Sequence, residues 1–437
     1  MANNKIFCNI PWFELNINHD GSYDLCGCQN NKLLGTELGQ VYNIKKIPIE
    51  DYWNSDRLKE ARLRKLGDIP DTMCKMCQNK DAIGYASNRV KENYKSVIFN
   101  EAFDRSYMQS PNYHHFKYSE ENNGATQSKI HSLHINLGSV CNFGCRMCNP
   151  FASTRLYTEF KQLGWLAKDD KFTHWTEHEQ GWNNFVKFLE QQAENIKVVH
   201  VIGGEVGFMP KFSFLINYFI DAGLADQVNF SFTTNGSLDY TEYYKLLSFY
   251  KRGEIGISIE SVDIMGDYIR QGGNIDKILK NISLMNDTVP SNTSLAIRTV
   301  PSLLSLPSYA KLISWAKDIG IPIDNSLLVS PPWQQAVLLP DNIKELIVTN
   351  VGAVLSSLPV AKNEFNNQKN ANNINASIRN ECESIIKLAQ TPAPSNADEL
   401  RKTCAEKLSQ WDKMKGINIK DYSSDLYSFL SGYGYNA

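Results

Sequence analysis

Short runs rich in aliphatic and β-branched residues recur along the middle of the chain, separated by longer stretches of helical periodicity. Runs with strand character occur, in chain order, at residues 133–137, 197–202, 227–233, 254–259, 294–300 and near 326–329. Strands separated by helix-length segments indicate βαβ units and a parallel sheet. The pattern therefore predicts an α/β fold for this part of the chain.

The N-terminal segment follows a different, two-residue period. Apolar side chains alternate with polar ones, as in a half-buried strand, at Phe13, Leu15 and Ile17. The Asp20-Gly21 pair that follows is a hairpin signal, and residues 22–25 return as a second strand. Residues 49–67 then have helical character. We expect a β-hairpin followed by helix in this segment.

Helical periodicity dominates the C-terminal part of the chain. Helices are predicted at residues 341–358, 378–388 and 400–413, with an Asn-rich stretch at 362–375 that we expect to be a loop. A chain of 437 residues exceeds the usual size of a single domain. We therefore divide it into a cysteine-rich module (1–95), a linker (96–128), an α/β domain (129–335) and a helical cap (336–437).

Composition and charge exclude several classes of protein. The chain is 42% hydrophobic and 21% charged, with a formal net charge of −2, so no basic excess points to nucleic acid or an anionic membrane. No apolar run approaches the roughly 18 residues of a membrane span, and the N-terminus lacks the layout of a signal peptide. We expect a cytoplasmic protein that does not associate with membranes.

The distribution of the cysteines along the chain indicates a more specific function. Eight of the ten cysteines lie between Cys8 and Cys148, and in a cytoplasmic chain such clustering indicates metal or redox chemistry rather than disulfides. The other two, Cys382 and Cys404, fall in predicted helices and are expected to be core thiols.

One cysteine loop directly follows the first predicted strand of the α/β domain. Cys141, Cys145 and Cys148 have the spacing CxxxCxxC. Thiolates suit iron–sulfur clusters and zinc, but a structural zinc site uses four ligands. Three thiolates can hold three irons of a [4Fe-4S] cube and leave the fourth iron open. The loop therefore predicts a metal site with one vacant position.

This loop resembles the hallmark of the radical S-adenosylmethionine (radical SAM) superfamily, in which CxxxCxxC follows the first strand of a partial (β/α)6 TIM-like barrel. The resemblance implies that Cys141, Cys145 and Cys148 are catalytic ligands of a [4Fe-4S] cluster. It also implies that the amino and carboxylate groups of SAM bind the open iron. Reductive cleavage would then yield a 5′-deoxyadenosyl radical that abstracts hydrogen from a substrate. Met147 replaces the aromatic residue that the family commonly packs near the adenine.

Other motifs at predicted strand ends also resemble the superfamily, and in barrels of this kind the active site lies at the C-terminal strand ends. Those implied to contact SAM are Gly203, Gly204 and Glu205 in the GGE position, Ser258 and Glu260 toward the ribose, and Arg270 toward the carboxylate. A guanidinium group matches a carboxylate well. A salt bridge on a helix surface is the alternative for Arg270.

The cysteine-rich module resembles the Twitch/SPASM type of auxiliary-cluster module, here preceding the barrel. The matching ligand set is Cys8, Cys26, Cys74 and Cys77, with Cys28 as a competitor for the place of Cys26. The implied cofactor is an auxiliary iron–sulfur cluster of the [4Fe-4S] type that transfers electrons. A structural zinc ion is the alternative.

Substrate-facing side chains must point into the barrel near the same strand ends. The residues that qualify by position are His134, Asn136, His200, Thr233, Arg298 and Trp333, and for each we favour packing as the explanation. A further alternative gives Cys382 or Cys404 a role as hydrogen-atom donor to a substrate radical.

Modules of this type resemble those of peptide maturases, so we predict a radical SAM enzyme that modifies a peptide or protein side chain. The implied partners are SAM, the substrate, and an electron donor such as a flavodoxin or ferredoxin. The alternatives are a small-molecule dehydrogenase or mutase, an RNA-modifying enzyme, which the absence of a basic excess disfavours, and a zinc-stabilised binding protein that is not an enzyme.

Overall fold

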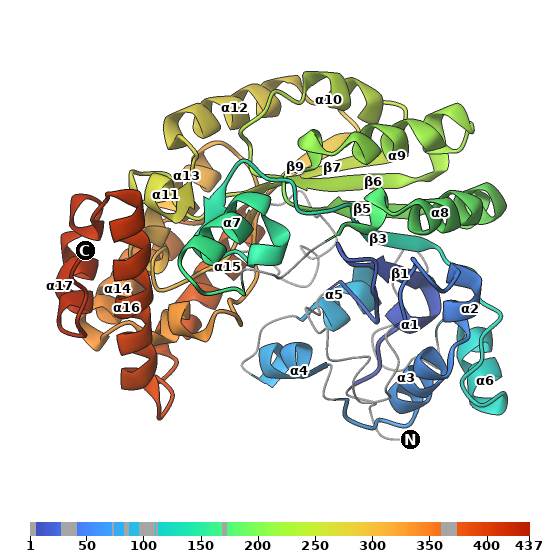
Figure 1. Cartoon of the computed structure of the whole chain (residues 1–437), viewed down its shortest axis with the longest axis horizontal. Helices are drawn as coiled ribbons and strands as arrows, with labels where there is room; N and C mark the ends of the chain where they lie inside the picture. Colours follow the sequence, from blue (N-terminus) through green and yellow to red (C-terminus); the bar gives the residue numbers. More distant parts are fainter. Residues whose placement is uncertain are drawn as a thin grey trace. The chain divides into compact units, whose positions relative to one another are not determined.

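The computed structural model describes residues 6–27, 42–71, 74–82, 87–95, 110, 112–167, 173–359 and 374–437. The chain forms two compact units. Figure 1 draws its helices and strands, coloured along the sequence. The first comprises residues 1–139, 171–232 and 246–253, and the second comprises residues 140–170, 233–245 and 254–437. Each unit is therefore assembled from segments that are distant in the sequence.

Strands of the first unit lie in the order β6-β5-β3-β1-β2. Their bounds are β1 Glu14–Ile17, β2 Tyr23–Asp24, β3 Ser132–Asn136, β5 Val198–Ile202 and β6 Asn229–Thr234, the last two residues of β6 belonging to the second unit. β1 and β2 pair antiparallel, which confirms the predicted hairpin. The pairs β1–β3, β3–β5 and β5–β6 are parallel, so the hairpin extends the same sheet.

The two faces of this sheet differ in character, as the alternation of residues requires. On β3 and β5 the fully buried positions are Leu133, Ile135, Val199 and Val201. On β6, Phe232 packs edge-on against Phe212 of α9 (Pro210–Asp221), with 5.1 Å between ring centroids. α8 (Glu179–Gln192) likewise buries Phe185 and Leu189. The alternate positions of β3, β5 and β6 are half-buried.

Helices follow the hairpin in the N-terminal segment. They are α2 Ile49–Trp53, α3 Asp56–Leu66, α4 Lys75–Ala82, α5 Asn88–Lys95 and α6 Tyr113–Glu121, and α1 Ile10–Phe13 precedes the hairpin. The helix predicted at 49–67 is divided because Ser55 caps α3, accepting a hydrogen bond from the Leu58 N–H. Helix α6 lies where we expected a linker. It forms there because Phe116 is fully buried, 5.0 Å from the ring of Trp12.

Strands of the second unit form two groups. β7 (Arg252–Ser258, whose first two residues belong to the first unit), β9 (Thr293–Thr299) and β10 (Ile323–Asn325) lie in the order β10-β9-β7, and β9 and β10 are parallel. β4 (Gly144–Cys145) pairs antiparallel with β8 (Arg270–Gln271). The helices between these strands are α7 Thr154–Gln162, α10 Thr241–Leu247, α11 Met265–Ile269, α12 Ile275–Thr288 and α13 Tyr309–Asp318.

The predicted position of the sixth strand was wrong. We expected it near residues 326–329, but β10 ends at Asn325. Ile323 is buried, whereas Val329 is 52% exposed and Leu327 and Leu328 are only half-buried, so the apolar run 327–329 does not belong to the sheet.

Four helices form the C-terminal part of the second unit in the residues that the structure describes: α14 Asp341–Ser356, α15 Ile374–Gln390, α16 Ala397–Lys415 and α17 Ser424–Ser431. The first three confirm the predicted helices, and α17 was not predicted. Most of the predicted Asn-rich loop lies outside the described residues. The α/β class, with a mostly parallel sheet and a helical C-terminal region, is confirmed. Among the described helices, none combines the length and the apolar composition needed to cross a membrane.

Candidate functional site

The CxxxCxxC loop is held by a short strand pairing in the second unit. Cys145 of β4 lies opposite Arg270 of β8. The Arg146 N–H next to it donates to the carbonyl oxygen of Ile269 at 2.8 Å, and the Cys148 N–H donates to the carbonyl oxygen of Cys145 at 3.0 Å. These bonds curl the loop so that its second and third cysteines lie one turn apart.

The three thiols of this loop lie close enough to influence one another. Burial raises the pKa of Cys145, and the nearby Cys148 and Cys141 raise it further against the opposing effect of Arg270. Burial also raises the pKa of Cys148 to about 12, and Cys141 contributes to that rise. Three sulfurs in a shielded region disfavour one another's negative charge until a positive group binds them. This is the electrostatic condition of a metal site.

Arg270 and Glu260, both predicted to contact SAM, are bound to each other. The Nε and Nη2 atoms of Arg270 donate to the two carboxylate oxygens of Glu260 at 2.5 and 2.8 Å. The third nitrogen, Nη1, lies 3.8 Å from the sulfur of Cys145. Both side chains are buried, so the alternative of a surface salt bridge was wrong. The pair keeps one guanidinium nitrogen directed at the cysteine loop.

Asn235 is a residue near the loop that the sequence did not single out. Its amide nitrogen donates to the side-chain oxygen of Asn142 at 2.9 Å and lies 4.0 Å from the sulfur of Cys141. Asn142 in turn donates to the Ser237 hydroxyl at 3.0 Å. The available signal was the Thr234-Asn235-Gly236 sequence at the end of β6, which we interpreted as a turn alone.

A glycine pair beside Arg270 was also overlooked as part of the site. Gly272 has φ +95°, and a Cβ atom there would lie 1.9 Å from the Nη1 atom of Arg155. That same nitrogen donates to the carbonyl oxygen of Asn142 at 3.0 Å. A Cβ atom at Gly273 would lie 3.1 Å from the ring of Phe143. The two glycines let α7 and the cysteine loop pack tightly against this turn.

The predicted GGE motif lies in the first unit at the end of β5. The Gly204 N–H donates to the carbonyl oxygen of Gly138 at 3.0 Å. A Cβ atom at Gly203 would lie 2.6 Å from the terminal methyl of Met209. It would also lie 3.0 Å from the carbonyl oxygen of Gly138. A side chain at Gly203 would therefore crowd the backbone of Gly138 and displace the end of the Met209 side chain. The side chain of Glu205 is fully buried.

Four cysteines of the N-terminal segment line one pocket of the first unit. These are Cys8, Cys26, Cys74 and Cys77, and Lys65 and Arg89 line the same pocket. Burial raises the pKa of Cys8 well above its ordinary value, and Cys26 adds to the rise. The structure thus brings together the four thiols predicted as one set. The competitor, Cys28, lies outside the described residues.

Two family models match the chain. The radical SAM superfamily matches residues 135–301, and an iron–sulfur cluster-binding domain, SPASM, matches residues 8–78. The chain contains a radical SAM domain and a SPASM domain. A radical SAM domain uses a [4Fe-4S] cluster and SAM, and a SPASM domain binds an auxiliary iron–sulfur cluster. No curated protein sequence matches the chain significantly.

Several solved structures are similar to the chain at low identity. "Native anSMEcpe with bound AdoMet" is 15% identical with a TM-score of 0.37, over 52% of this chain and 60% of that one. "Streptococcus suis SuiB bound to precursor peptide SuiA" is 12% identical with a TM-score of 0.37, over 64% of this chain and 60% of that one. In both cases the match spans about three fifths of the solved chain.

The donor sets of the radical SAM and SPASM domains suit iron–sulfur clusters. Each is composed of thiols, the ligands that such clusters use. In the part of the chain that the structure describes, no three Cys, His, Asp or Glu side chains are arranged around a single ion. A cube, in contrast, binds each thiolate at a separate corner, so its ligands stand further apart than those of one ion.

The half-buried face of the sheet in the first unit carries polar side chains. The rings of His134 and His200 lie 4.9 Å apart, and His200 Nδ1 lies 2.7 Å from the Ser231 hydroxyl. Asn136 shares this face.

In the second unit, Arg298 pairs with Asp324 and Glu254. Thr233 and Trp333 are half-buried there.

Met147, Ser258 and the two C-terminal cysteines complete the set of predicted residues. Met147 lies in the cysteine loop and is 9% exposed, and Ser258 is the half-buried last residue of β7. Cys382 and Cys404 are fully buried in α15 and α16. Such burial argues against a role for either thiol as hydrogen-atom donor to a substrate.

Proposed function

We propose that this protein is a radical SAM enzyme that acts on a peptide or protein side chain. Cys141, Cys145 and Cys148 would hold the [4Fe-4S] cluster that binds SAM. With SAM bound, the cluster supplies a 5′-deoxyadenosyl radical, which takes a hydrogen atom from the substrate. The observation that carries the proposal is the loop of three mutually close thiols, held by β8 beside the guanidinium of Arg270.

Residues at the strand ends would bind SAM. Gly203 and Gly204 would offer their backbone to the amino group together with Glu205, Ser258 would bind a ribose hydroxyl, and Met147 would pack near the adenine. Glu260 has a different role in this proposal from the one predicted from the sequence. Its two oxygens are engaged by Arg270, so Glu260 would orient the guanidinium and act on SAM through it.

The SPASM domain would hold its auxiliary cluster through Cys8, Cys26, Cys74 and Cys77. Four thiolates satisfy all four corners of a cube, so no iron remains open for a substrate. Electron transfer is then the role that suits this cluster. The grouping of the four thiols in one pocket supports this set.

The substrate class rests on the polar face of the sheet in the first unit. Ser132, His134, Asn136 and His200 present hydrogen-bonding groups on the half-buried positions of adjacent strands. A peptide carries closely spaced amide donors and acceptors that must be paired when they leave water. A net charge of −2 disfavours RNA as the substrate.

Anaerobic reconstitution tests the cluster and its chemistry together. The reduced protein incubated with SAM should release 5′-deoxyadenosine and contain iron and sulfide for about two cubes. Cys145→Ala should abolish the release. Cys382→Ala, which alters a buried thiol of a C-terminal helix, should retain it. A colourless, zinc-loaded protein would contradict the proposal and favour a binding protein.

The role of the auxiliary cluster needs its own variants. Cys74→Ala and Cys77→Ala should lose about half of the iron and retain cleavage of SAM, but they should fail to convert a peptide substrate. Full conversion by either variant after loss of its auxiliary cluster would contradict the electron-transfer role.

A further inference from the structure

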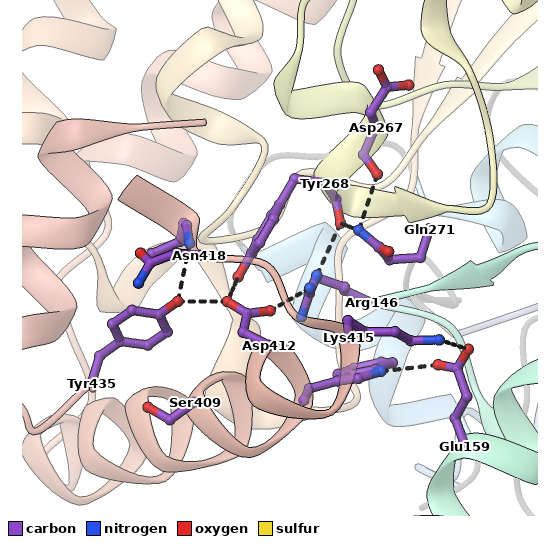
Figure 2. A network of polar contacts seen from close by, with 12 residues as sticks. Arg146, Glu159, Asp267, Tyr268, Gln271, Ser409, Asp412, Lys415, Asn418 and Tyr435 are labelled. Atoms are coloured by element: carbon purple, nitrogen blue, oxygen red, sulfur yellow. Dashed lines mark hydrogen bonds and ion pairs between the residues drawn. The ribbon is translucent and has the colours of Figure 1, made fainter. Parts of the chain in front are cut away.

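Arg146 lies between two of the loop cysteines, and its side chain reaches the C-terminal helix α16. Its Nη2 atom donates to Oδ1 of Asp412 at 2.5 Å, and its Nε atom donates to the carbonyl oxygen of Tyr268 at 2.9 Å (Figure 2). The guanidinium carbon lies 3.9 Å from the centroid of the Tyr268 ring. Both charged side chains are 0% exposed. The loop is thus joined to α16 by a fully buried ion pair.

The carboxylate of Asp412 is saturated with partners. Its Oδ2 atom accepts hydrogen bonds from the hydroxyls of Tyr268 at 2.8 Å and Tyr435 at 2.6 Å (Figure 2). Tyr435 follows α17 near the C-terminus, and its hydroxyl also accepts from the Ile419 N–H at 3.0 Å. The carboxylate therefore collects contacts from α11 and from the chain after α16, and it is held in one position.

The backbone of Arg146 is fixed on both sides as well. Its N–H donates to Ile269, as described above, and its carbonyl oxygen accepts from the side-chain amide of Gln334 at 2.7 Å. Arg146 is directly bonded to Cys145 and two residues before Cys148. A shift of Arg146 would therefore move both cysteines together.

A buried guanidinium needs a compensating charge, because an unpaired one is strongly unfavourable in a shielded environment. Asp412 supplies that charge. Without it, Arg146 would move toward water or toward the thiolates that would hold the cluster, and either movement displaces the sulfurs. An ion pair that served only to attach α16 would not need a partner in the cysteine loop. Here the partner of Asp412 is Arg146, which lies between Cys145 and Cys148.

We propose that Asp412 is a positioning residue for the radical SAM cluster. Acting through Arg146, it holds Cys145 and Cys148 where SAM can bind the cluster productively. The inference rests on the proposed function. It makes α16, which lies outside the matched region 135–301, part of the SAM-binding machinery.

The test uses the full chain, reconstituted anaerobically. Asp412→Asn keeps the shape of the side chain and removes its charge. The iron content, the electron paramagnetic resonance (EPR) spectrum of the reduced cluster, and the change of that spectrum on titration with SAM are measured. Partners behind metal ligands typically contribute 10–100-fold to affinity or activity. We therefore expect about tenfold weaker SAM binding in this variant.

A double variant separates positioning from stability. Arg146→Met with Asp412→Leu removes both charges, so no buried charge is left unpaired and thermal stability should recover. The response of the EPR spectrum to SAM should stay weakened, because nothing then directs the loop. If Asp412→Asn does not fold, the EPR response to SAM is measured on the double variant alone.

Glu381 offers a matched control. This buried carboxylate of α15 accepts hydrogen bonds from Tyr309 at 2.6 Å and Asn325 at 2.8 Å. Glu381→Gln should lower thermal stability and leave the response to SAM unchanged. An unaltered SAM titration in the folded Asp412 variants would overturn the inference. A wild-type protein without an EPR-active cluster would overturn the proposed function instead.

Discussion

The ammonium nitrogen of Lys65 lies 2.7 Å from the sulfur of Cys74. Lys65 belongs to α3 and is 1% exposed, and it lines the same pocket as the four cysteines of the SPASM domain. Burial raises the pKa of Cys74, and the positive charge of Lys65 opposes that rise. A buried cation therefore accompanies the site proposed for the auxiliary cluster.

Lys65→Met should lower the reduction potential of that cluster. The potential of an iron–sulfur cluster depends on nearby charge and on hydrogen bonds to its sulfurs, and loss of a buried positive charge disfavours the more negative, reduced form. A redox titration followed by EPR measures the shift. Lys65→Arg retains the charge and should stay close to the wild type. Equal potentials in all three proteins would refute the prediction.

Glu260→Gln should destabilise the protein by about 3–5 kcal/mol, because it leaves the buried guanidinium of Arg270 without its counter-charge. Urea unfolding under anaerobic conditions measures the free energy of unfolding. Glu242→Gln is the matched control, since its ion pair with Lys245 is exposed, and we expect a change of about 0–1 kcal/mol there. Similar small losses of unfolding free energy in both variants would contradict the prediction that Arg270 depends on Glu260 for its counter-charge.

Gly272→Ala should cost about 1–3 kcal/mol, because the residue adopts φ +95° and the new methyl group would collide with Arg155. Thermal unfolding with and without SAM measures the loss and its effect on the cysteine loop. Gly352→Ala in α14 is the control, because among the described residues, apart from its chain neighbours and the nearby backbone of α14, no atom lies within 4 Å of its Cβ position. Alanine should stabilise that helix by about 0.5–1 kcal/mol. A harmless Gly272→Ala would contradict both the backbone strain at this φ and the collision with Arg155.

Burial lowers the pKa of His134 to about 3, from an ordinary value of 6.5. Between about pH 3 and pH 6.5, the unfolded chain therefore binds a proton at His134 that the folded chain does not bind. The stability contributed by neutral His134 is fully present above pH 6.5 and is lost as the pH falls toward 3. Unfolding measured at pH 7.5 and 5.5 should differ by about 1 kcal/mol from this residue alone.

His134→Gln should remove that share of the pH dependence. His114→Gln, at an exposed position of α6, should retain the wild-type dependence. The prediction fails if the two variants respond to pH alike.

Much of the fold and part of the site could be predicted from local patterns. The two-residue alternation around Leu15 and the Asp20-Gly21 pair correctly predicted the hairpin, and strand and helix periods predicted the α/β class. The spacings of the cysteines indicated two sets of thiols. Such features are readable because the side-chain directions within one strand, helix or loop follow from the positions of neighbouring residues in the chain.

Contacts between distant segments could not be predicted from local patterns. Arg146 and Asp412 are 266 residues apart, and the local sequence around either residue does not indicate the other as its partner. Whether Arg270 would pair with Glu260, Lys65 with Cys74, or Phe116 with Trp12 depended on which segments pack together. The spacing of residues along the chain thus set the elements and the cysteine loop. Long-range packing set the partners of each buried charge, because a charge removed from water must pair with whichever opposite charge or hydrogen-bonding group the fold brings to it.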